Sequence, residues 1–269
     1  MKRLSSFPRD RCVVGMVHLK ALPGSPAWGG SMQEVIDAAL LDATALVKGG
    51  VDGMIIENFW DSPFPRGASQ PITISAMTAC VQEIRRAVSV PLGVNVLRND
   101  GVGALSIAAA AGAQFIRVNV LSYAMVTDQG IIQGCANEVA RARRVTVQPA
   151  EILADVMVKH SVPIGAMDIV TAARDTIFRG GADALIISGT ETGAPIDVED
   201  LAKVRAALPE VPLVSGSGVT IENLGRAARW LNLIVVGTHF KEEGRVERPV
   251  DRRRVAAFVD AVRKLPAEP

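Results

Sequence analysis

A chain of 269 residues, 49% hydrophobic and 21% charged, can bury a substantial core, which excludes a mostly disordered protein. Its 29 Lys and Arg against 28 Asp and Glu leave a net charge of +1, a balance that argues against nucleic acid as a partner. Three widely spaced cysteines and three histidines, without Cys-x-x-Cys or His-Glu-x-x-His, exclude a disulfide framework, a cysteine-rich zinc site and a zincin.

No targeting or membrane-spanning segment is visible in the sequence. The longest apolar runs are far shorter than the roughly 18 residues that a membrane helix needs. The few cysteines are typical of a reducing compartment, so we expect a cytoplasmic protein without an integral membrane segment; peripheral attachment to a membrane stays open. The arginine runs at 141–144 and 252–254 fall in helical segments, where we expect them to be solvated.

Eight short apolar runs rich in Val and Ile recur along the chain. Each has about five residues and is typical of a strand that is buried on both faces. In chain order they are Cys12–Val17, Gly53–Glu57, Leu92–Val96, Phe115–Val120, Glu151–Val156, Ala184–Ser188, Leu213–Ser215 and Leu233–Gly237.

Segments with helical periodicity separate these runs. Ser31 and Glu34 have the form of a capping box before the first long helix. Gly50, Gly112 and Gly181 are placed to end helices just before a strand. Apolar residues recur at three- and four-residue spacing in the stretches 35–47, 74–88, 201–208 and 255–262.

This alternation of strand and helix favours a TIM (β/α)8 barrel, which needs about 250 residues. No linker or compositional break divides the chain, so we expect a single domain over residues 1–269, with the barrel at about 12–265. An open doubly wound sheet is the alternative. That fold usually carries a Gly-x-Gly-x-x-Gly fingerprint after its first strand, a pattern that the stretch 18–24 lacks.

Polar residues collect at the predicted carboxyl ends of the strands, where TIM barrels place their chemistry. A purely structural barrel would show Val, Leu or Ala there, and charged residues are seldom buried without a partner. A structural ion pair, such as Arg117 with Glu57 or Asp155, is the alternative for any one of them. The candidates are His18, Glu57, Asn58, Asn95, Arg98, Arg117, Asn119, Asp128, Asp155, Lys159, Ser188 and Thr192.

The last two strands lead into glycine-rich turns. Glycines let backbone N–H groups approach an anion closely, and Ser and Thr add hydroxyl donors. Many barrels hold a substrate phosphate at these two turns, although two ordinary turns would look the same. Lys241 either adds charge to this site or is solvated. The expected phosphate-binding residues are Gly216, Ser217, Gly218, Gly237 and Thr238.

The sequence resembles the BtpA (BtpA/SgcQ) family over nearly its whole length. The resemblance implies a TIM barrel similar to the ribulose-phosphate-binding barrels. The resemblance implies a function less specifically than it implies the fold. The founding cyanobacterial member is associated with biogenesis or stability of photosystem I proteins, whereas relatives elsewhere lie among sugar-metabolism genes and carry nucleosidase-like labels. The stretch Val145–Glu151 is not matched. The motifs that carry the resemblance are Gly15–Leu19, Leu22–Pro26, Asp52-Gly53 with Glu57–Phe59, Gly93–Asp100, Arg117–Val120, Val126–Gly130, Ala154–Val156 with Lys159-His160, and Gly216–Thr220.

These features favour an enzyme that acts on a phosphorylated sugar or nucleoside, by nucleosidase-like hydrolysis or by isomerisation. Glu57 and Asp155 are the predicted general acid and base, and Arg117 would stabilise negative charge. A Schiff-base role for Lys159 is open. No cofactor is evidently required, and a divalent metal on Asp155 and Glu57 is undecided.

Two other functions fit the same sequence. One is a photosystem I biogenesis or stability factor without catalysis, as the resemblance implies. The other is a barrel that senses a phosphorylated metabolite without converting it. In each case we expect a homo-oligomer, because barrels of this kind often pair.

Overall fold

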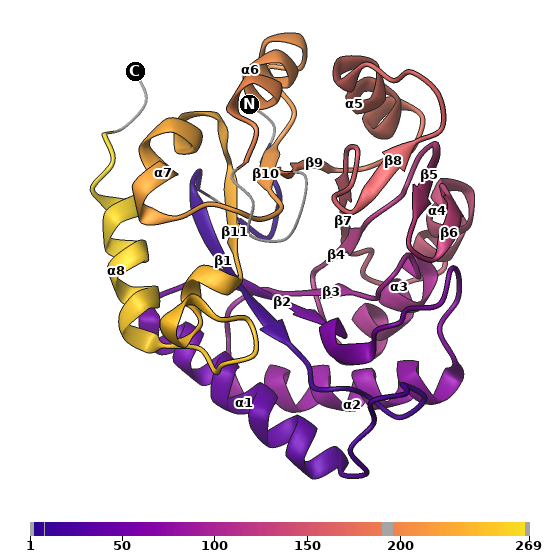
Figure 1. Cartoon of the computed structure of the whole chain (residues 1–269), viewed down its shortest axis with the longest axis vertical. Helices are drawn as coiled ribbons and strands as arrows, with labels where there is room; N and C mark the ends of the chain where they lie inside the picture. The colour runs from indigo at the N-terminus through magenta and orange to yellow at the C-terminus, as the bar shows by residue number, and fades with distance from the viewer. Residues whose placement is uncertain (1–2, 8, 190–195, 267–269) are drawn as a thin grey trace.

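The strands and helices alternate as the sequence predicts in the computed structural model, which describes residues 3–7, 9–189 and 196–266. The barrel strands are β1 Cys12–His18, β2 Gly53–Glu57, β3 Leu92–Asn95, β4 Phe115–Val118, β7 Glu151–Asp155, β9 Ala184–Ile187, β10 Leu213–Ser215 and β11 Leu233–Val236. They are parallel and close a barrel in the order β1-β11-β10-β9-β7-β4-β3-β2 (Figure 1). The predicted TIM barrel is confirmed.

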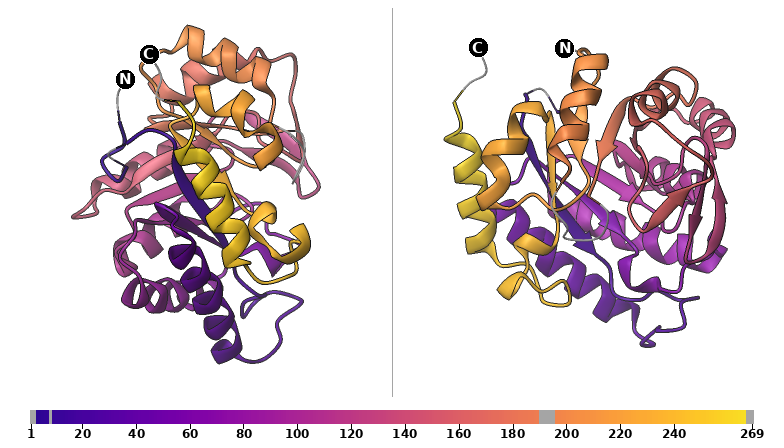
Figure 2. Two further views of the ribbon diagram at one scale, coloured as in Figure 1. Left: turned by 90° about the vertical axis from the view of Figure 1, so that its left-hand side faces the viewer. Right: turned by 45° about the horizontal axis from the view of Figure 1, so that its top comes forward.

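A helix follows each barrel strand in the chain. The helices are α1 Met32–Gly49, α2 Pro71–Ala87, α3 Gly101–Ala111, α4 Ala136–Arg144, α5 Ile169–Phe178, α6 Val198–Ala207, α7 Ile221–Ala227 and α8 Arg252–Arg263. The first helix, α1, contacts both α2 and the last helix α8, so the outer layer closes around the strands (Figure 2). Within the described ranges, none of these helices has both the length and the apolar composition needed to cross a membrane.

Ser31, Gly50 and Gly112 act where the sequence puts them, whereas α5 already ends at its C-cap Arg179, two residues before Gly181. The Oγ of Ser31 accepts a hydrogen bond from the backbone N–H of Glu34 at 3.2 Å, which caps α1. At the other ends, Gly50 and Gly112 follow α1 and α3 with φ of 93° and 70°. Side chains with a Cβ rarely adopt this left-handed conformation, so glycine ends each helix there and lets the next strand begin.

Apolar side chains fill the barrel interior toward the amino ends of the strands. The residues of this inner cluster include Val14, Met16, Ile55, Leu153, Ile186, Val214 and Val235. The N-terminal segment adds Phe7, whose ring packs edge-on against Phe115 with 5.4 Å between centroids. Because Phe115 is the first residue of β4, this packing closes the amino end of the barrel. The carboxyl end is left for a site.

Gly93 of β3 leaves the space that Phe115 occupies inside the barrel. A Cβ on Gly93 would lie 2.1 Å from Cε2 of the fully buried Phe115. We expect Gly93→Ala to lower the free energy of unfolding by about 1–3 kcal/mol, measured by urea unfolding. Gly225→Ala is the control, since nothing lies within 4 Å of its Cβ. Inside α7 that alanine should stabilise by about 0.5–1 kcal/mol; equal losses in both variants would contradict the packing argument.

A second sheet of three antiparallel strands lies beside the barrel, and the sequence patterns do not predict it. Its strands are β5 Ala124–Thr127, β6 Gly130–Gln133 and β8 Ser161–Pro163, in the order β6-β5-β8. Residues 127–130 form the tight connection between β5 and β6. Met125 and Ile132 of this sheet form a buried cluster with Val120 and Val158. The sheet thereby anchors the segment between β7 and β8.

Candidate active site

Four polar side chains occupy one level at the carboxyl end of the barrel. His18 pairs in register with Glu57, Glu57 with Asn95, and Asn95 with Arg117, across β1, β2, β3 and β4. Neighbouring residues in register on parallel strands point to the same side of the sheet. The sequence prediction that the strand ends bring these residues together is therefore matched by the geometry.

A cavity with two lobes lies at this level. The first, here called the glycine lobe, has a volume of about 190 Å³ and is lined by the turns 216–220 and 237–239 with Met16, His18, Val236, Gly244 and Arg254. The second, the aromatic lobe, has a volume of about 300 Å³ and is lined by Trp60, Ser62, Phe64, Leu97, Arg98, Asn119 and His160. Glu57, Phe59, Arg117 and Lys159 line both lobes, and we call them the shared wall.

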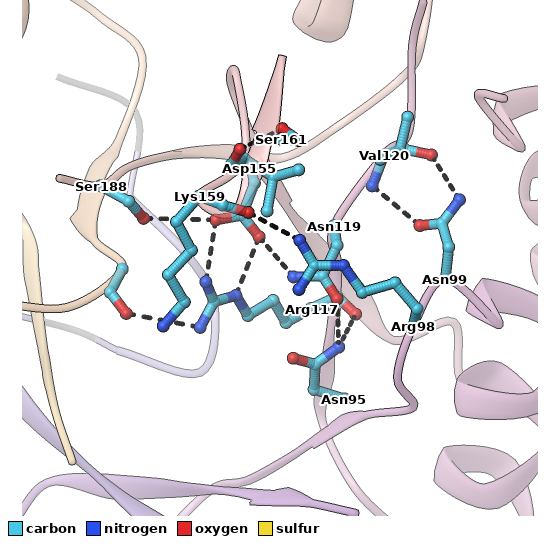
Figure 3. A network of polar contacts seen from close by, with 12 residues as sticks. Asn95, Arg98, Asn99, Arg117, Asn119, Val120, Asp155, Lys159, Ser161 and Ser188 are labelled. Carbon is cyan, nitrogen blue, oxygen red and sulfur yellow. Dashed lines mark hydrogen bonds and ion pairs between the residues drawn. The ribbon is translucent and has the colours of Figure 1, made fainter. Parts of the chain in front are cut away.

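Arg117 and Asp155 form a buried bidentate ion pair. Arg117 Nε donates to Asp155 Oδ2 at 2.9 Å, and its Nη2 donates to Oδ1 at 2.8 Å (Figure 3). Asn119 and Ser188 also donate to this carboxylate, at 3.0 and 3.4 Å. Burial alone would lower the pKa of Arg117, but the adjacent Asp155 carboxylate raises it. About four lone pairs are available on a carboxylate, so these donors occupy Asp155 fully and fix the guanidinium.

Amide side chains support this ion pair and the neighbouring loops. Asn95 Nδ2 donates to Asn119 Oδ1 and to the backbone carbonyl of Arg117, both at 3.2 Å. Asn58 Oδ1 accepts a hydrogen bond from the backbone N–H of Leu97 at 2.7 Å, which ties the loop after β2 to the loop after β3. Substrate binding by both asparagines stays a prediction. Their hydrogen bonds stabilise the walls of the site, and Asn95 Oδ1 is buried without a partner among the described residues.

Glu57 and Lys159 differ from that pair because neither side chain has a hydrogen-bond partner among the described residues. Glu57 Oε1 lies 4.0 Å from Nε2 of His18, outside hydrogen-bond range. Burial raises the pKa of Glu57, although the charges of Arg117 and Lys159 oppose the rise. Burial, helped by Arg117, lowers the pKa of Lys159 to about 8. Both groups are shifted toward neutral pH, where general acids and bases are most effective.

His18 contributes a neutral ring to the site. It stacks on Phe59 with 4.4 Å between centroids. Burial lowers the pKa of His18 well below its ordinary value, and the charges of Lys241, Lys159 and Arg117 add to that effect. Lys241 itself is neither solvated nor at the glycine turns, because its Nζ is buried 2.5 Å from Oδ2 of Asp42.

The remaining predicted residues fall in three groups. All five expected phosphate-binding residues line the glycine lobe. Arg98 lines the aromatic lobe, where its Nη2 donates to the carbonyl oxygen of Lys159 at 2.6 Å. Asp128 lies in the β5–β6 turn. Burial lowers the pKa of Arg98, and the negative charge of Asp128 opposes this change. Thr192 lies outside the described residues.

The described part of the chain contains no group of three or more His, Cys, Asp or Glu side chains that could hold a metal ion. Asp155 gives its lone pairs to Arg117, Asn119 and Ser188. The undecided divalent ion on Asp155 and Glu57 would have to displace some of these donors.

Phe59, Phe64 and Arg254 are among the lining residues that the sequence did not predict. Phe59 and Phe64 line the aromatic lobe beside Trp60. Arg254 lines the glycine lobe and donates to the carbonyl of His239 at 2.7 Å, although its arginine run is typical of a solvated face. Only the turn of α8 toward the glycine lobe distinguishes it from Arg252 and Arg253.

Solved structures of other barrels resemble this fold. Phosphoribosyl anthranilate isomerase from Thermococcus kodakaraensis matches with a TM-score of 0.56 and 17% identity, covering 95% of this chain and 100% of that one. Thiamine phosphate pyrophosphorylase from Pyrococcus furiosus matches with a TM-score of 0.57 and 12% identity, covering 94% and 96%. At such identities the likeness shows the fold alone.

Sequence relatives are more informative. The photosystem I biogenesis protein BtpA from Synechocystis sp. is 45% identical over 262 residues, covering 97% of this chain and 91% of that protein. The sgc region protein SgcQ from Escherichia coli is 31% identical over 259 residues, covering 95% and 96%. A model of the BtpA family matches residues 9–264. These matches confirm the resemblance found in the sequence: the chain belongs to the BtpA family.

Proposed function

We propose that this protein is an enzyme that binds a small phosphorylated sugar or nucleoside and catalyses proton transfer on it, in a hydrolysis or an isomerisation. One observation carries the proposal: glycine turns suited to an anion line the same cavity as Glu57 and Lys159, two ionisable groups that have no hydrogen-bond partner within the described part of the chain. A barrel with only a structural role has no use for an unpartnered buried carboxyl group, because burial makes its charged form costly.

The glycine lobe supplies the anion site of this proposal. Ser217 Oγ is buried there without a partner among the described residues, so a phosphate oxygen would satisfy it. Gly218 has a φ of 76°, a conformation that keeps the turn free of a side chain. Arg117 and Arg254 line the same lobe and add positive charge. These features support a dianionic group at this end of the ligand.

The shared wall supplies the chemistry. With its pKa raised by burial, Glu57 can hold a proton and give it to a substrate oxygen, and its carboxylate can take one back. Arg117, held in position by Asp155, would stabilise negative charge that develops on the substrate. The expected acid–base role of Asp155 stays a prediction, and its four hydrogen bonds favour the positioning of Arg117 instead.

A thermal-shift screen tests the binding half of the proposal. We expect inorganic phosphate, ribose 5-phosphate and nucleoside 5′-monophosphates to include at least one ligand that raises the melting temperature. Gly218→Glu should weaken that ligand by at least about tenfold, because a carboxylate would enter the lobe and repel phosphate. Gly112→Glu is the matched control, since its φ of 70° imposes the same strain at the amino end of the barrel. No shift with any compound, or equal weakening in both variants, would refute the anion site.

The similarity to the photosystem I biogenesis protein BtpA favours a second candidate, an assembly factor without catalysis. Affinity capture from the native host distinguishes the two: an assembly factor should retain photosystem proteins after Glu57→Gln, whereas the enzyme should bind its ligand and lose product formation. A metabolite sensor would bind the ligand and form no product even with Glu57 intact.

A further inference from the structure

The segment 156–160 holds Lys159 in a fixed and uncommon backbone conformation. Met157 and His160 take φ of 55° and 56°, a left-handed conformation that only a few per cent of non-glycine residues adopt. Val158, between them, is anchored in the buried cluster under the small sheet. On the other side, Arg98 Nη2 binds the carbonyl oxygen of Lys159 at 2.6 Å. The backbone of Lys159 is thus held from two directions while its side chain reaches the shared wall.

The ammonium group of Lys159 has an unusual environment for a lysine. The side chain of Lys159 is partly buried, yet no carboxylate of the described residues lies within 4.0 Å of its Nζ. The charged groups that act on it are Arg117 and Arg98, which repel it, and Glu57 and Asp155, which attract it. Figure 3 shows the side chain extending beside the guanidinium of Arg117. With a pKa of about 8, about a tenth of this amine is neutral at pH 7.

We propose that Lys159 is a nucleophile that forms an imine with the carbonyl carbon of a phosphorylated aldose or ketose. The inference rests on the proposed function, because the phosphate in the glycine lobe would bring the carbonyl carbon to the shared wall. A neutral amine presented on a rigid segment, beside a carboxyl group that can deliver a proton, is the arrangement that imine chemistry needs.

The chemical steps balance without an added oxidant or reductant. Nζ adds to the carbonyl carbon, a proton moves from nitrogen to oxygen, and the resulting carbinolamine loses its hydroxyl group as water with a proton from Glu57. The protonated imine then withdraws electrons from the adjacent carbon, whose C–H proton passes to the Glu57 carboxylate to leave an enamine. Reprotonation and hydrolysis reverse these steps and restore the free amine.

Reductive trapping tests the proposal. The whole protein is incubated with glyceraldehyde 3-phosphate, dihydroxyacetone phosphate, ribose 5-phosphate or ribulose 5-phosphate, and then with sodium borohydride. We expect peptide mass spectrometry to find one secondary amine, on Lys159, at a yield at least about tenfold above that with the unphosphorylated sugars. Lys159→Arg should abolish the adduct, and Glu57→Gln should slow its formation about 100-fold. Lys20→Arg is the control and should change nothing, because that lysine is exposed beside Glu34.

The outcomes separate this inference from the proposed function. Thermal shift with the same four compounds verifies that Lys159→Arg is folded and binds phosphate. Binding without an adduct in the wild type would overturn the nucleophile and leave the phosphorylated ligand standing. Neither binding nor adduct would overturn both. Labelling spread over surface lysines and retained in Lys159→Arg would also overturn the assignment.

Discussion

Asp155→Asn is expected to lower the free energy of unfolding by about 3–5 kcal/mol, because it leaves the guanidinium of Arg117 buried without its counter-charge. Both side chains are almost fully removed from solvent, at 3% and 0% exposure. In addition to the salt bridge, the substitution weakens the hydrogen bonds from Asn119 and Ser188. Urea unfolding followed by circular dichroism gives the measurement.

A double variant shows whether the ion pair or the space it fills is responsible. Arg117→Met with Asp155→Leu should cost less than Asp155→Asn, about 1–3 kcal/mol. Apolar residues of similar volume often replace a buried pair at no cost, but the buried amide of Asn119 loses its acceptor. The exposed pair of Lys203 and Asp200, 3.2 Å apart, is the control, and Lys203→Gln should cost less than about 1 kcal/mol. If Asp155→Asn had the same urea midpoint as the wild type, another group would have to balance the charge of Arg117.

Lys159→Met is expected to act in the opposite direction and to raise the free energy of unfolding at pH 7 by about 1–3 kcal/mol. The folded chain holds this proton less tightly than the unfolded chain, because burial lowers the pKa from 10.5 to about 8. Protonation at pH 7 therefore favours the unfolded state, and a shift of that size is worth at most about 3 kcal/mol. Methionine keeps the packing of the lysine stem and removes the charge.

The pH dependence shows whether charge or packing causes the gain in stability of Lys159→Met. Between pH 8 and 10.5 the unfolded chain binds more protons at this position than the folded chain, so wild-type stability rises with pH through that window. The advantage of Lys159→Met should shrink over the same range. Urea unfolding at pH 7 and pH 10 gives the two values, with Lys20→Met as the exposed control. A difference between wild type and Lys159→Met that stays constant with pH would point to packing rather than charge.

The barrel could be predicted because its strands are buried on both faces, which makes each one a continuous apolar run. Their ends shift by at most two residues, as where β4 stops at Val118 instead of Val120. The small sheet could not be predicted. In its four-residue strand β5, Met125 is buried and Val126 is exposed, an alternation too short to stand out. Its pairing of Thr127 with Ser161 depends on contacts between distant parts of the chain.

The level of the site could also be predicted, whereas its internal pairing could not. Glu57 and Arg117 lie at strand ends, and parallel strands bring such ends together. The sequence could not show whether Arg117 pairs with Glu57 or with Asp155, because a long side chain at that level can reach both carboxylates. Two donated hydrogen bonds decide for Asp155. Glu57 has no hydrogen-bond partner in the described ranges, and this difference supports the separate roles proposed for the two carboxylates.

Because the two lobes share a wall, ligands for each lobe can be sought separately. A fragment that fills only one lobe still touches Glu57, Phe59, Arg117 and Lys159, while the other lobe remains open. Small anions and flat aromatic compounds can therefore be screened separately, and a pair that occupies the cavity together outlines the complete molecule. Joining such a pair should yield an affinity beyond that of either half, because the second half then binds at a high effective concentration.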